Sequence, residues 1–154
     1  LRFFAVRRPQ VLRFALQNWK PIMVADALSL VVAAAHSLRL RAVLSAVSGK
    51  GDGPLDLLQL SASGALGSNL VNNLPAYLAL EPVAGNPLRI AALLIGVNAG
   101  PLVTPLASLS TLLWHDRRKA LDATIPWGRY CLLGLAAAPL TVAAATLGLA
   151  LVHP

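Results

Sequence analysis

Long apolar stretches separated by short polar turns set the pattern of this chain. Three of them, 21–38, 88–114 and 127–152, are long enough to cross a membrane. About 20 apolar residues are needed to cross a hydrocarbon core about 30 Å thick. We therefore expect membrane-spanning helices over about 21–47, about 87–115 and about 127–152.

The segment between the first two stretches is too polar in its middle to span a membrane. It follows the turn SGKGDGP (48–54) and reads LDLLQLSASGALGSNLVNNLPAYLALEP. This pattern predicts two short helices that meet at GSNLVNNLP, and the small residues of the first helix would allow close packing. Polar turns at membrane depth are tolerated only where protein or water surrounds them. We expect a re-entrant hairpin over about 55–82.

The second long stretch carries an interruption of its own. Residues that weaken or break a helix gather in its centre, namely Gly96, Gly100, Pro101 and Pro105. We expect an unwound centre with a half-helix on each side. Half-helix ends expose free amides and carbonyls with partial charges, and transporters use such ends to bind substrates near the membrane midplane. The last stretch, kinked at Pro139, has little chemistry and is expected to be structural.

The composition and the placement of charge both favour a membrane protein. Of 154 residues, 56% are hydrophobic and 12% charged, against about a quarter charged in a soluble domain, and the mean hydropathy is +0.67. The basic residues form two clusters, one before the first predicted span and one between the last two: Arg2, Arg7, Arg8, Arg13 and Lys20, and Arg117, Arg118, Lys119 and Arg129. The positive-inside rule places both clusters in the cytoplasm.

We therefore expect a multi-pass protein of the inner cell membrane with a cytoplasmic N-terminal segment. Residues 1–20 alternate basic and apolar side chains, which suits a helix or arm on the membrane surface. A solvated linker from an upstream domain fits this segment equally well. The placement of the basic residues follows the positive-inside pattern, so nucleic acid is not an expected partner.

The sequence offers no catalytic or metal-binding pattern. The single Cys131 and the scattered histidines lack the spacing of metal ligands, and we find neither a nucleophile–base pair nor a phosphate-binding loop. We expect no enzyme activity, no metal and no cofactor. Asp26 is an acid near the start of a predicted span, which makes it the candidate for coupling transport to protons. Its nearness to the membrane surface favours a plain structural role instead.

Two motifs in order, GSNLVNNLPAYLAL and GVNAGPLVTPLASLSTLLWHD, resemble the arsenical pump membrane protein family, the arsenite and antimonite efflux permeases of the ion-transporter superfamily. The resemblance covers residues 56 to about 134. It implies an all-α fold of two inverted repeats, each with a re-entrant hairpin and a broken helix. This chain would hold the second repeat, over residues 21–154. One departure is Ala107, where the family usually has Gly.

The resemblance also implies which residues bind the substrate. The hairpin tip and the broken helix would supply half of a binding site, made of Ser68, Asn69, Asn72, Asn73, Asn98, Thr104, Ser108 and Thr111. Amides and hydroxyls both donate and accept hydrogen bonds, which suits the uncharged trihydroxide form of arsenite. Simple packing or capping could also explain individual asparagines, and we expect Asn72 or Asn73 to cap the second hairpin helix.

The implied function is export of arsenite or antimonite, coupled to the proton gradient. Partners would be the small ion, the lipid bilayer, and a missing N-terminal repeat or a second copy of the chain. A cytoplasmic ATPase subunit is a further partner left open. Two alternatives also stay open: the same fold moving another small ion, by Na⁺/H⁺ exchange or as a carboxylate, and an inactive or truncated membrane remnant.

Overall fold

The computed structural model describes residues 19–36, 40–119, 121 and 126–153, and the regular secondary structure among them is helical, with no strand. This confirms the predicted all-α class. The helices are α3 (Trp19–His36), α4 (Leu40–Val47), α5 (Pro54–Val71), α6 (Asn73–Ala84), α7 (Pro87–Ala99), α8 (Leu109–Lys119) and α9 (Trp127–Val152), with a short 3₁₀ turn, η1 (Pro105–Ala107), before α8. The predicted segment 1–20 lies outside the described residues except for the start of α3.

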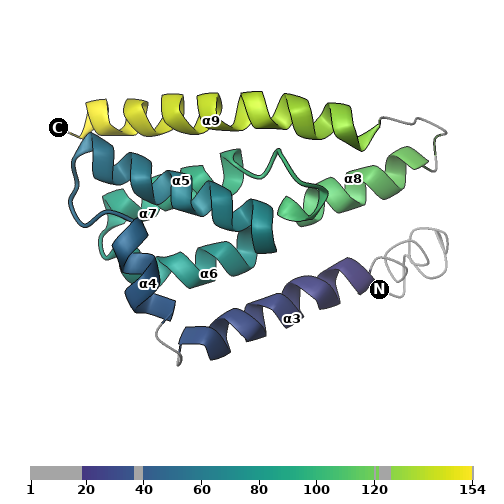
Figure 1. The fold of residues 1–154 in the computed structure, drawn as a ribbon, viewed down its shortest axis with the longest axis horizontal. Helices are drawn as coiled ribbons and strands as arrows, with labels where there is room; N and C mark the ends of the chain where they lie inside the picture. The colour runs from purple at the N-terminus through teal and green to yellow at the C-terminus, as the bar shows by residue number, and fades with distance from the viewer. Residues whose placement is uncertain (1–18, 37–39, 120, 122–125, 154) are drawn as a thin grey trace, which may run out of the picture.

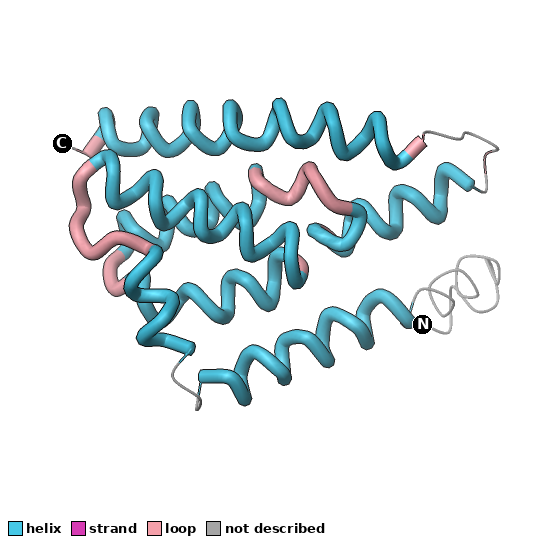
Figure 2. The backbone as a smooth tube through the Cα atoms, in the orientation of Figure 1, coloured by secondary structure: helices cyan, strands magenta, loops and turns pink. Residues whose placement is uncertain are grey.

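The helices lie side by side around α5, which packs against α6, α7 and α9. Helix α9 runs the whole length of the molecule, α6 packs beside α7, and α3 packs on the outer side of α6 (Figure 1). Helices α5 and α6 form a hairpin, and the loop between α7 and α8 is the long irregular segment in the middle of the fold (Figure 2). Both the hairpin tip and this loop lie partway along α9 (Figure 1).

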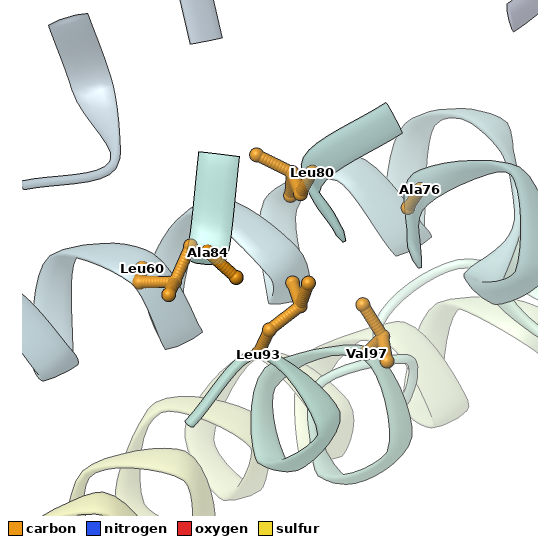
Figure 3. Close-up of a cluster of buried hydrophobic side chains, with 6 residues drawn as sticks. All are labelled: Leu60, Ala76, Leu80, Ala84, Leu93 and Val97. Carbon is orange, nitrogen blue, oxygen red and sulfur yellow. The ribbon is translucent and has the colours of Figure 1, made fainter. Parts of the chain in front are cut away.

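A small apolar core joins the hairpin to α7. Its members are buried and come from α5, α6 and α7: Leu60, Ala76, Leu80, Ala84, Leu93 and Val97 (Figure 3). Half of them are alanine or valine, so the helix backbones approach closely. Burial of each large side chain contributes about 1.5–3 kcal/mol in water, and in a membrane the same contacts act chiefly through dispersion.

Close backbone contact is possible because small residues face each other across helices, as predicted for α5. A Cβ atom on Gly96 would overlap the backbone of Ser61, and one on Gly100 would overlap Ala65. Gly96 lies inside α7 rather than in the interruption, so its predicted role as a helix-breaking residue was wrong. Its lack of a side chain lets α5 and α7 touch, which outweighs its weak helix propensity.

Arg89 organises the end of the molecule where α5 and α7 begin. Its side chain is 3% exposed, and its guanidinium donates to the carbonyl oxygens of Ala84, Ser48, Gly49 and Gly51 at 2.5–3.0 Å. These acceptors belong to two turns, 48–53 and the one between α6 and α7. A buried charge needs such partners, and here carbonyl dipoles supply them.

Among the described residues, one helix is long and apolar enough to cross a membrane, namely α9. Only 17% of its most apolar window is buried, and large leucines cover its outer side. The predicted span 87–115 consists of α7 and α8 with the irregular loop between them, and 21–47 consists of α3 and α4. The number of membrane crossings therefore stays a prediction.

Candidate functional site

The hairpin tip turns at Asn72. Its backbone has φ 96° and ψ 153°, and it is the non-glycine residue with positive φ in the described part of the chain. This region of backbone space strongly favours glycine, and holding another residue there costs about 1–3 kcal/mol. The Asn72 side chain accepts a bond from the Leu74 amide at 3.4 Å and so caps α6. The expectation that Asn72 or Asn73 caps this helix is confirmed.

Asn69 connects the tip to the α7–α8 loop with its whole side-chain amide. Its Nδ2 donates to the Gly100 carbonyl and to Ala65 one turn back in α5, each at 2.8 Å. Its Oδ1 accepts from the backbone amides of Val103 and Thr104 at 3.1 and 3.0 Å. An asparagine side chain has two N–H donors and two acceptor sites, so all four are occupied.

Two further bonds connect the same segments. The Thr104 hydroxyl donates to the Asn69 carbonyl at 2.8 Å, and Asn72 Nδ2 donates to the Leu106 carbonyl at 2.9 Å. Backbone groups released by the loss of helix at 100–108 therefore find partners on the hairpin tip. The structure brings Asn69, Asn72 and Thr104 together, and all three are bonded within the protein.

The two serines that were predicted to bind substrate, Ser68 and Ser108, form hydrogen bonds to residues close to them in the sequence. Ser68 is fully buried and its hydroxyl donates to the Gly64 carbonyl at 2.8 Å within α5. Ser108 lies just before α8, and its hydroxyl pairs with that of Ser110 at 2.6 Å and accepts from the Ser110 amide. The Ser108 carbonyl accepts from Thr111 and Leu112, so this residue starts α8.

Asn73, Thr111 and Asn98 differ from the other predicted residues. Within the described residues, the side chains of Asn73 and Thr111 make no hydrogen bond, and both are partly exposed. Asn98 is exposed on α7 and donates only to the Leu94 carbonyl of its own helix, so it stands apart from the tip. These three side chains retain capacity for an external ligand, whereas Asn69 has none left.

Two cavities flank the junction of the tip and the loop. One of about 260 Å³ lies among α3, the tip, the loop and α8, and Asn72 is its polar residue. The other, about 330 Å³, lies between α5, the loop and the middle of α9, and Asn69 is its polar residue. Both walls are otherwise apolar, so polar groups line these spaces only where the tip meets the loop.

Asp26, the proposed coupling acid, lies away from this junction. Val24 and Leu28 line the cavity beside α3, and residues four apart share a helix face. Asp26 is about 200° around the helix from both by the 3.6-residue period, and it is exposed. Its side chain makes no hydrogen bond or ion pair within the described residues.

Sequence reasoning missed the hydroxyl of Ser110 and the role of Arg89. Ser110 follows Ser108 in the motif ASLST, and paired hydroxyls before an apolar run are a signal of a helix start. Arg89 follows Asn86 and Pro87 at a helix start, but a sequence gives no sign that its charge is buried. No group of metal-ligating side chains occurs within the described residues.

The matching relatives are arsenical pump membrane proteins. The chain is 38% identical over 79 residues to one from Escherichia coli, and 37% identical over 76 residues to one from Escherichia coli strain K12, covering 46% and 44% of the chain. It is 36% identical over 83 residues, 49% of the chain, to a provisionally named arsenical pump membrane protein of Bacillus subtilis strain 168.

These matches cover 18–19% of each relative, so the chain aligns with about a fifth of the length of the curated relatives it matches. No protein-family model matches the chain. No solved structure matches it either. The resemblance to part of the arsenical pump membrane proteins, predicted from two motifs, is confirmed.

Proposed function

We propose that this chain is one repeat of a membrane transporter that exports arsenite or antimonite. The observation that carries the proposal is the docking of two polar helix interruptions, through Asn69, at mid-length of an otherwise apolar bundle. Unwound helices at membrane depth are tolerated where protein or water satisfies them, and transporters place their binding sites there. The relatives named as arsenical pumps supply the substrate class.

In this proposal the bundle axis lies along the membrane normal. Helix α9 has 26 residues, which corresponds to about 39 Å at 1.5 Å per residue and is enough to cross the bilayer. The hairpin of α5 and α6 enters and returns on one side, and α7 and α8 together cross. The basic cluster at the end of α8 and the start of α9 then faces the cytoplasm of a multi-pass inner-membrane protein.

The substrate would be held by a side chain that the fold leaves unbonded within the described residues, namely that of Asn73 at the hairpin tip. Arsenite at neutral pH is a small trihydroxide, and such a side chain can donate to and accept from its hydroxyls. The N-terminal repeat would supply the other half of the site. Asn69 and Asn72 then hold the site in shape without touching the substrate.

Coupling to protons is the less supported part of the proposal. Asp26 is the candidate acid, and its exposed side of α3 is available for contact with the missing repeat. If it carries the proton, Asp26→Asn abolishes dependence of export on the proton gradient while leaving arsenite binding intact.

The proposal is tested by arsenite accumulation in cells that lack their own exporter. The chain is expressed alone and together with the N-terminal repeat of a related permease. We expect accumulation to fall only when both are present. Asn73→Ala should restore accumulation in that pair, and Gln59→Ala, which removes an exposed side chain outside the site, should not.

Membrane insertion and protein level are measured for every variant by immunoblot of membrane fractions. Unchanged accumulation in the paired cells, with normal insertion, would remove arsenite export from the proposal and leave the fold as described. Equal export by wild type and Asn73→Ala would show that the unbonded amide does not bind the substrate.

A further inference from the structure

The three tryptophans of the chain all lie toward one end of the molecule. Trp19 begins α3, Trp127 begins α9, and Trp114 lies in α8, whose last residues approach the same end (Figure 1). The opposite end carries the turn 48–53 and the α6–α7 turn, with none of the three. Tryptophan and tyrosine gather at the level of lipid headgroups in membrane proteins. This asymmetry marks the α8–α9 end as a membrane–water boundary.

Between α8 and α9 the rings form a contiguous cluster, which we call the aromatic cluster and define as Trp114, His115, Trp127 and Tyr130. Ring centroids are 4.3 Å apart for His115 and Trp127, 5.5 Å for Trp127 and Tyr130, and 6.2 Å for Trp114 and Tyr130. The Arg118 guanidinium lies over the Trp114 ring at 4.8 Å and contacts His115 Nδ1 at 3.0 Å. The cluster therefore fixes one positive charge between the helices.

A shallow cavity of about 300 Å³ opens beside this cluster, lined by Ser110, Thr111, Trp114 and Tyr130. Arg117 and Arg129 are exposed at the same end, on α8 and α9. About one turn further along α9, Leu132 and Leu133 are 70% and 72% exposed. This end of the molecule thus carries, over a short distance, positive charge, aromatic rings, hydroxyls and exposed leucines.

We propose that this cavity binds one anionic phospholipid. The phosphate lies near Arg117, Arg118 and Arg129, its glycerol and ester oxygens lie beside the aromatic cluster, and an acyl chain follows the leucines of α9. Charge complementarity selects the occupant, since residues 114–130 contain four basic and two acidic residues. A free phosphate would use the arginines but gain nothing from the leucines. The inference rests on the proposed membrane location and not on transport.

The test is native mass spectrometry of the whole chain in neutral detergent. Phosphatidylglycerol and phosphatidylcholine with identical acyl chains are titrated, and glycerol phosphate serves as the headgroup without the tail. We expect one phosphatidylglycerol to bind at least tenfold more tightly than phosphatidylcholine, and glycerol phosphate not to displace it. Because basic residues near an anionic surface each add about a fivefold factor, Arg117→Gln with Arg129→Gln should weaken binding by at least tenfold.

The control pair is Arg41→Gln with Lys50→Gln, which removes the same charge from exposed residues away from the α8–α9 end and should leave binding unchanged. Circular dichroism confirms that both double variants fold. Equal affinity for the two lipids in the wild type would overturn the proposal without any variant. An equal loss of phosphatidylglycerol affinity in both double variants would also overturn it, because it would indicate attraction by net charge alone. Displacement by glycerol phosphate would assign the arginines to a free anion.

Discussion

Helices α7 and α9 pack together, and a proline follows the end of α7 while another lies inside α9, but the chain responds differently to the two. Pro139 lies inside α9, which continues unbroken from Trp127 to Val152. At Gly100 and Pro101 the chain leaves the α-helix and resumes it only at Leu109. A proline frees one carbonyl and removes one donor, and a helix commonly absorbs that loss with a kink. The difference therefore lies in the surroundings.

The α7–α8 loop has polar partners on a distant segment, whereas the side-chain bonds next to Pro139 come from Thr141 of the same helix. Asn69 bonds Gly100, Val103 and Thr104, and Asn72 bonds Leu106. The cavity wall that includes Pro139 is otherwise leucine, alanine, valine and glycine, apart from that same Asn69, whose amide the loop already occupies. A break at membrane depth is stable only where each released backbone group finds a partner. The tip of the hairpin is thus what allows α7 and α8 to remain separate.

The largest loss of stability is expected from removing the side chain of Asn69, which hydrogen-bonds to the α7–α8 loop. Asn69→Leu deletes four hydrogen bonds and leaves the Val103 and Thr104 amides of the loop without their partner. At about 0.6–1 kcal/mol per bond, the free energy of unfolding in detergent should fall by about 2–4 kcal/mol. Asn98→Leu, which loses one exposed bond within α7, should change it by less than 0.5 kcal/mol. Equal losses would show that the loop does not depend on Asn69.

The next largest change in stability is expected where α9 packs against the α7–α8 loop. A Cβ on Gly134 would overlap the Leu102 carbonyl, so Gly134→Ala must push α9 away and should lower the unfolding free energy by about 1–3 kcal/mol. Gly148→Ala, in the same helix with nothing near, should raise it by up to about 1 kcal/mol through helix propensity. Thermal unfolding followed by circular dichroism compares the two. A gain at both positions would contradict close packing of α9 on the loop.

A smaller effect separates the two roles of Asn72. Asn72→Ala loses the bonds to Leu74 and Leu106 and keeps the unfavourable backbone, whereas Asn72→Gly loses the same bonds and relieves the backbone. The glycine variant should therefore be more stable than the alanine variant by about 1 kcal/mol. Chemical unfolding of both in the same detergent measures the difference. A more stable alanine variant would mean that the positive φ carries no strain.

The sequence was sufficient for the two hairpin helices and for the place of the interruption after α7, but not for the division of 21–47 into α3 and α4. Glycine, proline and asparagine act through local backbone geometry. Pro101 and Pro105 therefore predict a helix break, and Asn72 a helix cap, without knowledge of the fold. The small residues of α5 likewise predicted close packing. These signals depend on chain neighbours within a few positions, which a sequence displays directly.

Contacts between distant segments could not be predicted from the sequence. Asn69 looked like a ligand for the substrate, and only the approach of residues 100–104 shows that its amide is used up. Gly96 looked like a helix breaker because its partner, Ser61, is 35 positions away. The role of Arg89 was missed, because its acceptors lie in the turn 48–53 and at the end of α6. In each case the local sequence allowed more than one role for the residue, and the tertiary contacts show which role it has.

We propose that the unbonded side chain of Asn73 at the tip, and not that of Asn69, binds arsenite. The decisive experiment is arsenite uptake by everted membrane vesicles, with this chain paired with the N-terminal repeat and each variant compared at equal protein. We expect Asn73→Ala to raise the arsenite concentration for half-maximal uptake at least tenfold, with an unfolding free energy near that of the wild type. Wild-type concentration dependence in Asn73→Ala, or no arsenite uptake by the wild-type pair, would contradict it.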